Sequence, residues 1–150
     1  MNKPGKIAAY AALAVCAGLL LMQLVPYGRN HTNPPVVREP LWDSSDTRAL
    51  AKRACFDCHS HETFWGAWYS KVAPSSWLVQ YDVDQGRREL NFSDWQGGAR
   101  EGEGAAKLGR EISKGEMPPL QYRIAHPEAR LSEAEKRRLI DGLAATANRR

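Results

Sequence analysis

The sequence predicts an all-α protein, in which one N-terminal membrane-spanning helix precedes a domain of four or five short helices joined by long loops. Three observations lead to this prediction. An uncharged apolar run opens the chain, several short segments carry helix caps and apolar stripes, and no stretch alternates polar and apolar residues as a strand does. With 150 residues, 43% hydrophobic and 25% charged, the chain is long enough for one domain with its own core.

The apolar run covers residues 7–25. As a helix it would reach roughly 28 Å, close to the thickness of the hydrocarbon core of a bilayer. Lys3 and Lys6 precede it without a neighbouring acid, so residues 1–6 are expected in the cytoplasm and the rest is expected to be exported. A cleaved signal peptide is the alternative, but no small-x-small site ends the run. Cys16 resembles a lipid-attachment cysteine only weakly, because Val15 precedes it.

Residues 26–41 contain four prolines and no periodicity, which is typical of an extended tether. His31 lies in this tether and is expected to be solvated. The formal net charge is +4, of which Lys3 and Lys6 supply two, so a basic nucleic-acid-binding face is not indicated. The folded domain is therefore expected over residues 42–150.

Four segments of this domain carry helix signals. They are residues 47–54 after a cap at Ser45 or Asp46, residues 77–81 ending before Gly86, residues 103–114 ending at Gly115, and a last helix that opens with the capping box Ser132-Glu133-Ala134-Glu135. Long loops rarely order themselves unaided, so we expect a bound group to fill part of the core.

The segment Cys55-Phe56-Asp57-Cys58-His59 matches the attachment site of c-type haem. In such sites both sulfurs bond to the vinyl groups and the histidine binds the iron. Export fits this interpretation, because haem c is attached outside the bacterial cytoplasm. A structural zinc site would need four ligands, and a thioredoxin-like site would need a βαβ pattern. The motif therefore predicts one haem c per chain, with His59 as an iron ligand.

A second iron ligand is expected downstream. Met117 follows a predicted helix end and precedes two prolines, and it is the only methionine outside the first 25 residues. His126, before Pro127, is its rival. His61 is too close to His59 to reach the opposite face of a haem.

Other cofactor contacts are also expected. All five tryptophans lie outside the apolar run, and such side chains can pack a haem edge or bind its propionates through N–H groups. Trp68 is the candidate among them, with plain core packing as the alternative. Arg87 could pair with a propionate, although a surface role is equally open.

A longer set of motifs accompanies these residues. In order, they are CxxCHS at 55–60, Thr63, Trp68-Tyr69, Ala73-Pro74-Ser75-Ser76-Trp77, Asp82-Val83, Gly86-Arg87, Asn91-Phe92-Ser93-Asp94-Trp95, Gly115-Glu116-Met117-Pro118-Pro119, Tyr122, His126-Pro127 and Leu131-Ser132. Over about residues 42–142 this set resembles the bacterial haem-binding domain family of small cytochrome-c-like proteins. The resemblance implies haem c on Cys55 and Cys58, ligation by His59 and Met117, and an N-terminal membrane segment. The chain departs from the family at Ala67, where proline is common, and at Tyr81, where histidine is frequent.

The function expected from the sequence is electron transfer. The chain would be a membrane-anchored monohaem cytochrome c in the bacterial inner membrane, with its C-terminal domain in the periplasm and redox proteins there or in the membrane as partners. No catalytic residue is needed, so an enzyme is not predicted. The alternatives are a haem enzyme or a gas or redox sensor with a displaceable distal ligand, and a haem-bearing module of a larger respiratory complex.

Overall fold

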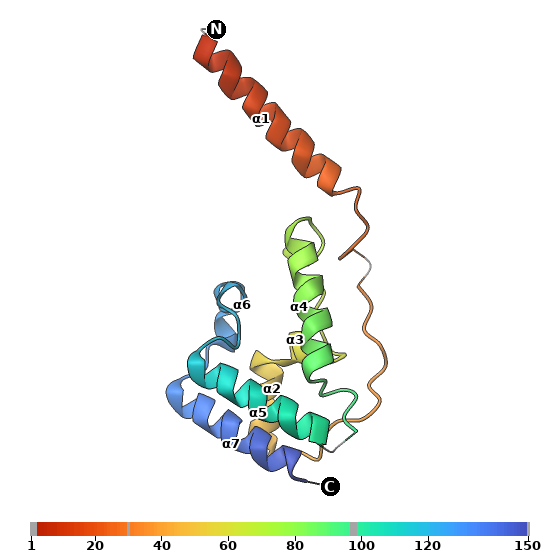
Figure 1. The fold of residues 1–150 in the computed structure, drawn as a ribbon, viewed down its shortest axis with the longest axis vertical. Helices are drawn as coiled ribbons and strands as arrows, with labels where there is room; N and C mark the ends of the chain where they lie inside the picture. The colour runs from red at the N-terminus through yellow and green to blue at the C-terminus, as the bar shows by residue number, and fades with distance from the viewer. Residues whose placement is uncertain (1–2, 30, 97–98, 150) are drawn as a thin grey trace. The chain divides into compact units, whose positions relative to one another are not determined.

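The structure is a computed structural model that describes residues 3–29, 31–96 and 99–149. Every regular secondary-structure element in these ranges is a helix, which confirms the predicted all-α class. The single β-like feature in the same ranges is a bridge between Arg38 and Asp94. The elements are α1 Lys3–Met22, α2 Ser45–Ala54, α3 Phe56–His59, η1 Trp68–Ser70, α4 Ser75–Glu89, α5 Ala99–Lys114, α6 Leu120–Ala125, η2 Pro127–Ala129 and α7 Glu133–Ala147 (Figure 1).

Helix α1 contains most of the apolar run. Within the described part of the chain it alone is long and apolar enough to cross a membrane, and none of its residues is buried. It begins four residues before the predicted segment, because Pro4 is compatible with the first turn of a helix. It ends at Met22, and three backbone hydrogen bonds from Gln23, Leu24 and Val25 close its last turn.

Contacts divide the chain into two compact units. The first unit comprises Met1–Thr32 and Trp65–Asp82, and the second comprises Asn33–Phe64 and Val83–Arg150. Helix α4 begins in the first unit and ends in the second. The boundary between Thr32 and Asn33 falls inside the predicted tether.

His31 is packed within the first unit, so the expectation of a solvated side chain is wrong. Its ring stacks on Trp65 with centroids 3.9 Å apart and parallel planes. Nδ1 lies 3.1 Å from Oε1 of Gln80, and Nε2 contacts the carbonyl of Ser70. The stacking on Trp65 and the two polar contacts take the place of contacts with water, so the ring is packed within the first unit.

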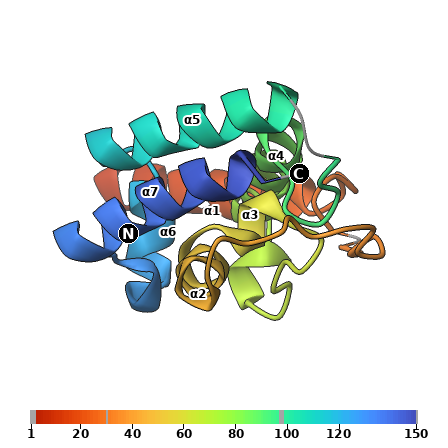
Figure 2. The same ribbon diagram turned by 90° about the horizontal axis from the view of Figure 1, so that it is seen from below.

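The core of the second unit is built on α5 and α7. These helices lie side by side and antiparallel, and α2 packs on α7 (Figures 1 and 2). Gly142 permits the close approach of α2 to α7, because a Cβ at this position would lie 2.7 Å from Cγ2 of Thr47 in α2. The buried cluster consists of Leu50, Ala51, Ala54, Cys55, Phe56, Leu90, Phe92, Trp95, Leu108, Ile112, Leu139 and Leu143.

Several helix boundaries differ from the predicted ones. Ser44, not Ser45 or Asp46, caps α2, since its hydroxyl accepts the N–H of Thr47 at 3.1 Å. Helix α4 runs from Ser75 through Gly86 to Glu89 instead of ending before Gly86. The short helices α3 and α6 carry no strong sequence signal, so six α-helices follow α1 in the described ranges instead of four or five. The capping box of Ser132 and Glu135 is confirmed.

Candidate functional site

The cysteine motif forms a sharp junction between two helices. α2 ends one residue before Cys55, whose N–H still donates to the carbonyl of Ala51 at 2.8 Å. Cys55 then leaves helical geometry, with φ −126° and ψ −31°, and the chain enters the single turn of α3. The N–H groups of Cys58 and His59 both donate to the carbonyl of Cys55, at 3.1 and 2.9 Å. The two cysteines therefore stand one turn apart.

The two cysteines are thiols in different environments. Cys55 belongs to the buried core cluster, and only 8% of its surface is exposed. Burial raises the pKa of the Cys55 thiol to about 12, and the neighbouring Cys58 adds to this effect. Cys58 is half-buried. At neutral pH Cys55 is thus a protonated thiol.

His59 is held in one orientation by a backbone carbonyl. Its ring is buried, and Nδ1 lies 3.0 Å from the carbonyl oxygen of Leu90, which directly follows α4. A carbonyl can only accept, so Nδ1 carries the proton and the lone pair is on Nε2. Burial lowers the pKa of His59, although the carbonyls of Leu90 and Gly86 oppose this effect. A neutral imidazole with a fixed tautomer is the form that binds a metal.

Gly86 lets α4 approach the motif closely enough to place Leu90. A Cβ at position 86 would collide with the carbonyl oxygen of Cys58 and would lie 2.9 Å from its carbonyl carbon. A side chain is therefore excluded here for steric reasons. This also explains why a glycine occurs inside α4, where its helix propensity is unfavourable.

Asp57, between the two cysteines, joins the motif to two other segments. Its Oδ1 accepts the N–H of Phe64 at 2.9 Å, and its Oδ2 accepts the hydroxyl of Tyr122 at 2.7 Å. Thr63 donates to the Asp57 carbonyl at 2.7 Å. Burial, and after it the Asp57 carboxylate, raises the pKa of Tyr122 well above its usual value. The hydroxyl thus stays protonated and ties α6 to the motif.

Met117 lies just before this tied helix. Gly115 ends α5 with φ +77°, and the N–H groups of Glu116 and Met117 both donate to the carbonyl of Glu111, at 2.9 and 3.2 Å. The half-buried Met117 side chain packs against the core cluster that contains Cys55. The structure therefore brings Met117 to the same cluster as the cysteine motif.

The two other histidines near the motif have partners within the protein. His126 stacks on Tyr122, with centroids 4.3 Å apart, and its Nδ1 lies 2.8 Å from Oε1 of Glu128. His61 contacts the carbonyl of Pro35 through Nδ1 and the amide of Asn91 through Nε2, at 2.8 and 2.9 Å. Both ring nitrogens of His61 are therefore engaged.

Arg87 and Trp68 lie in different surroundings. Arg87 donates to the Ser60 carbonyl at 2.8 Å, to Thr63 at 3.0 Å and to Asn33 at 3.1 Å, so it braces the loop after the motif. Trp68 belongs to the first unit, on η1, and 73% of its surface is exposed.

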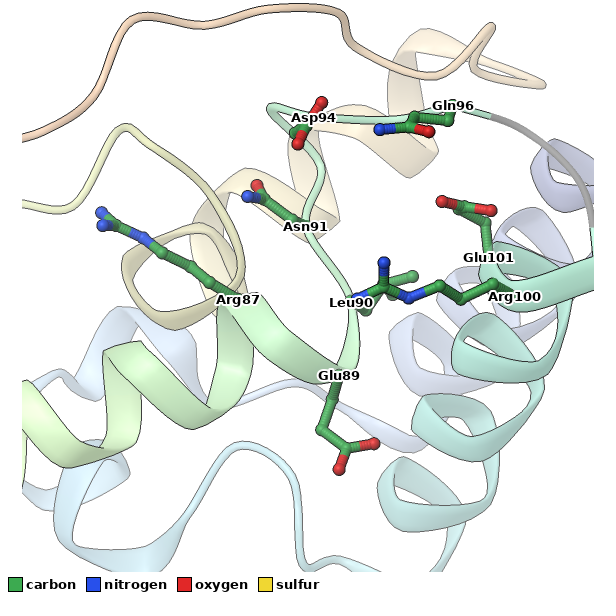
Figure 3. A pocket seen from close by; sticks show the side chains of 8 residues that line it. All are labelled: Arg87, Glu89, Leu90, Asn91, Asp94, Gln96, Arg100 and Glu101. Atoms are coloured by element: carbon green, nitrogen blue, oxygen red, sulfur yellow. The ribbon is translucent and has the colours of Figure 1, made fainter.

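A small pocket lies where α4 passes into the following loop, beside the start of α5. Figure 3 shows its lining residues, which are Arg87, Glu89, Leu90, Asn91, Asp94, Gln96, Arg100 and Glu101. Its volume is about 60 Å³, and five of these residues are charged. Pockets for organic cofactors are usually about 300–1,000 Å³ and mostly apolar, so this pocket is too small and too polar for one.

Comparison with known proteins identifies the family. The family described as haem-binding domain matches residues 17–145, which is most of the chain. The chain belongs to this haem-binding domain family. Neither the curated proteins nor the solved structures contain a match.

The residues of the haem-binding domain fit its cofactor chemically. His59 has a neutral ring with Nε2 as its lone-pair nitrogen, and the half-buried thioether of Met117 lies by the same core cluster. Arg123, on α6, donates through Nη2 to the Gly115 carbonyl at 3.2 Å, while its buried Nε has no hydrogen-bond partner among the described residues. A carboxylate such as a haem propionate would satisfy this donor.

Sequence reasoning missed Asp57, Gly86, Tyr122 and Leu90 as positioning residues. Gly86 and Tyr122 belong to the motifs that resemble the family, so a signal was present without a role attached to it. Leu90 acts through its backbone carbonyl, which every residue type offers. No side-chain pattern could have singled it out.

Proposed function

We propose that this haem-binding domain is a membrane-anchored monohaem cytochrome c that carries electrons in the periplasm. One haem c would be bonded to Cys55 and Cys58, with iron between His59 and Met117. The observation that carries the proposal is the geometry of the motif. Two thiols one turn apart adjoin a neutral histidine whose Nδ1 is fixed on the carbonyl of Leu90.

The roles of the individual residues follow from this arrangement. The hydrogen bond from Nδ1 to Leu90 orients His59 and strengthens Nε2 as a ligand. Met117 offers a soft thioether, which favours reduced iron and raises the reduction potential. A bound haem would supply a one-electron couple, and the task of His59 and Met117 would be to hold it. The contacts of Arg87 with a propionate and of Trp68 with the haem edge remain predictions.

The anchor is part of the same proposal. Residues 7–25 would span the inner membrane, with residues 1–6 in the cytoplasm, residues 26–41 as the connection and residues 42–150 as the periplasmic domain. The length and composition of α1 support a span, but a signal sequence would pass the same test. Protease added to spheroplasts should digest the chain after Pro26 while the protein stays in the membrane fraction. A soluble product beginning after residue 17 would replace the anchor by a cleaved signal.

Attachment of the cofactor can be tested directly. In protein matured in a periplasm, the colour should stay with the polypeptide after acid-acetone extraction. The pyridine haemochrome should have the position typical of two thioethers. Cys55→Ala with Cys58→Ala should release the haem, and extractable haem in the unaltered chain would refute covalent attachment.

The distal ligand separates an electron carrier from an enzyme or sensor. Met117→Ala should lower the reduction potential and open a site for carbon monoxide, which the unaltered protein should bind poorly. His126→Ala is the matched control and should leave the spectrum nearly unchanged. Rapid carbon monoxide binding by the unaltered protein, with a spectrum that responds to His126→Ala and not to Met117→Ala, would favour the enzyme or sensor. In that case the redox proteins of the periplasm or inner membrane would no longer be the expected partners.

A further inference from the structure

The first unit contains a segment fastened to the end of α1. The side-chain amide of Gln23 pairs with the backbone of Ala73 in both directions. Its Nε2 donates to the Ala73 carbonyl at 2.9 Å, and its Oε1 accepts the Ala73 N–H at 3.0 Å. The same Nε2 also contacts the carbonyl of Leu19 in α1, at 3.0 Å. The end of the helix and residue 73 are thus held together.

Two further contacts strengthen this attachment. Gly28 has φ +68° and approaches the start of α4 so closely that a Cβ would lie 2.8 Å from the carbonyl carbon of Ser76. His31 stacks on Trp65 and contacts Gln80. Gln23, Gly28 and His31 therefore contact residues 65–80 at three successive points.

If α1 is the anchor proposed above, its length sets how deeply residues 65–80 lie in the membrane. Its 20 residues would extend about 30 Å, which is the thickness of the hydrocarbon core. With the span at residues 7–25, as proposed, its periplasmic end is at Val25, two residues after Gln23. Gln23 and its partner Ala73 then lie at the polar interface of the bilayer, and residues 68–72 lie beside them.

The side chains on this segment suit such a location. Trp68 is 73% exposed and Val72 is 43% exposed, and Leu24 and Val25 directly after α1 are exposed as well. Lys71 is the only charged residue between Trp65 and Tyr81. Tryptophan and lysine concentrate where the hydrocarbon core meets the lipid headgroups.

We infer that Trp68, Lys71 and Val72 form a second membrane contact, which inserts into the interface of the bilayer that α1 crosses. Trp68 and Val72 reach the acyl boundary, and Lys71 meets the headgroup phosphates. The inference rests on the proposed anchor and is independent of the haem ligands. It competes with the prediction that Trp68 covers the haem edge, so one experiment must separate the two.

The test uses the full haem-loaded chain in nanodiscs of phosphatidylcholine and phosphatidylglycerol. A lipid-soluble diazirine is photolysed to a carbene, and the labelled residues are located by mass spectrometry. Residues 65–72 are expected to be labelled about tenfold more than α7, because the probe partitions into the bilayer. Trp68→Ser with Val72→Ser should remove most of this labelling. The control Leu120→Ser with Ile124→Ser changes another exposed apolar pair, on α6, and should leave the labelling of residues 65–72 unchanged.

Each other outcome overturns the inference. If α1 is labelled while residues 65–72 match α7, the second contact is absent and the anchor stands. If neither is labelled, the anchor fails and the contact fails with it. If the Trp68 and Val72 variant keeps its labelling but alters the haem absorbance, Trp68 belongs to the cofactor. The haem spectrum of the same sample reports independently on the proposed cytochrome.

Discussion

Gly86 offers the most direct test of how α4 positions the candidate haem site. An alanine at position 86 would place Cβ 2.9 Å from the carbonyl carbon of Cys58 and 3.0 Å from its Cβ. Alanine gains about 1 kcal/mol of helix propensity over glycine. Overpacking costs about 1–3 kcal/mol, and the upper value applies because the contact is with backbone. Gly86→Ala should therefore lower the free energy of unfolding by about 2 kcal/mol.

Gly102→Ala is the matched control. Gly102 also lies in a helix, but a Cβ there would meet nothing within 4 Å, so this variant should gain about 0.5–1 kcal/mol. Urea unfolding followed by circular dichroism would measure both. The variants should differ by about 3 kcal/mol, which corresponds to at least about 1 M in the urea midpoint. Equal stability of the two would refute the close approach of α4 to Cys58.

Three further predictions concern the second unit. Tyr122→Phe removes the donor to Asp57 and should cost about 1–3 kcal/mol of unfolding free energy, whereas Tyr10→Phe, on the exposed face of α1, should cost nothing. An equal effect of both would show that the bond to Asp57 is immaterial. The N–H of Ser132 and the side chain of Arg53 lower the pKa of Glu135 to about 2, from an ordinary value of 4.5. Its carboxylate therefore stabilises the folded state above pH 4.5, and the stability difference from Glu135→Gln should vanish as the pH falls towards 2; a constant difference would contradict this. Gly142→Ala should destabilise the chain by about 1–3 kcal/mol, and Thr47→Ala in the same chain should recover part of that loss, since it removes Cγ2 at 2.7 Å. Simple addition of the two losses would show that α2 and α7 do not meet there.

The sequence predicted best where a local pattern acts within one turn of helix. The spacing of Cys55, Cys58 and His59 and the capping box at Ser132 depend on neighbours only, and the structure has both arrangements. Helix ends were less predictable. Gly86 signals a helix end in isolation, but α4 continues through it because tertiary contact with Cys58 requires a glycine there.

Contacts between residues far apart in the chain could not be predicted from the sequence, for a different reason. The carbonyl of Leu90 and the carboxylate of Asp57 find partners that are 31 and 65 residues away along the chain. Any residue has a carbonyl, and aspartate is common, so composition gives no sign of the pairing. His31 illustrates the same limit, because its stacking on Trp65 depends on how the first unit folds.

The burial of Cys55 constrains the order of events in maturation. In the folded chain this thiol is enclosed by α2 and by the core that α5 and α7 complete. If haem is bonded to Cys55, the bond must therefore form on a chain whose C-terminal helices have not yet closed over the motif. The cofactor would then be attached before or during folding, and a chain that had already closed would first have to reopen around Cys55. Periplasmic yield of coloured protein should accordingly depend on how fast the C-terminal helices dock.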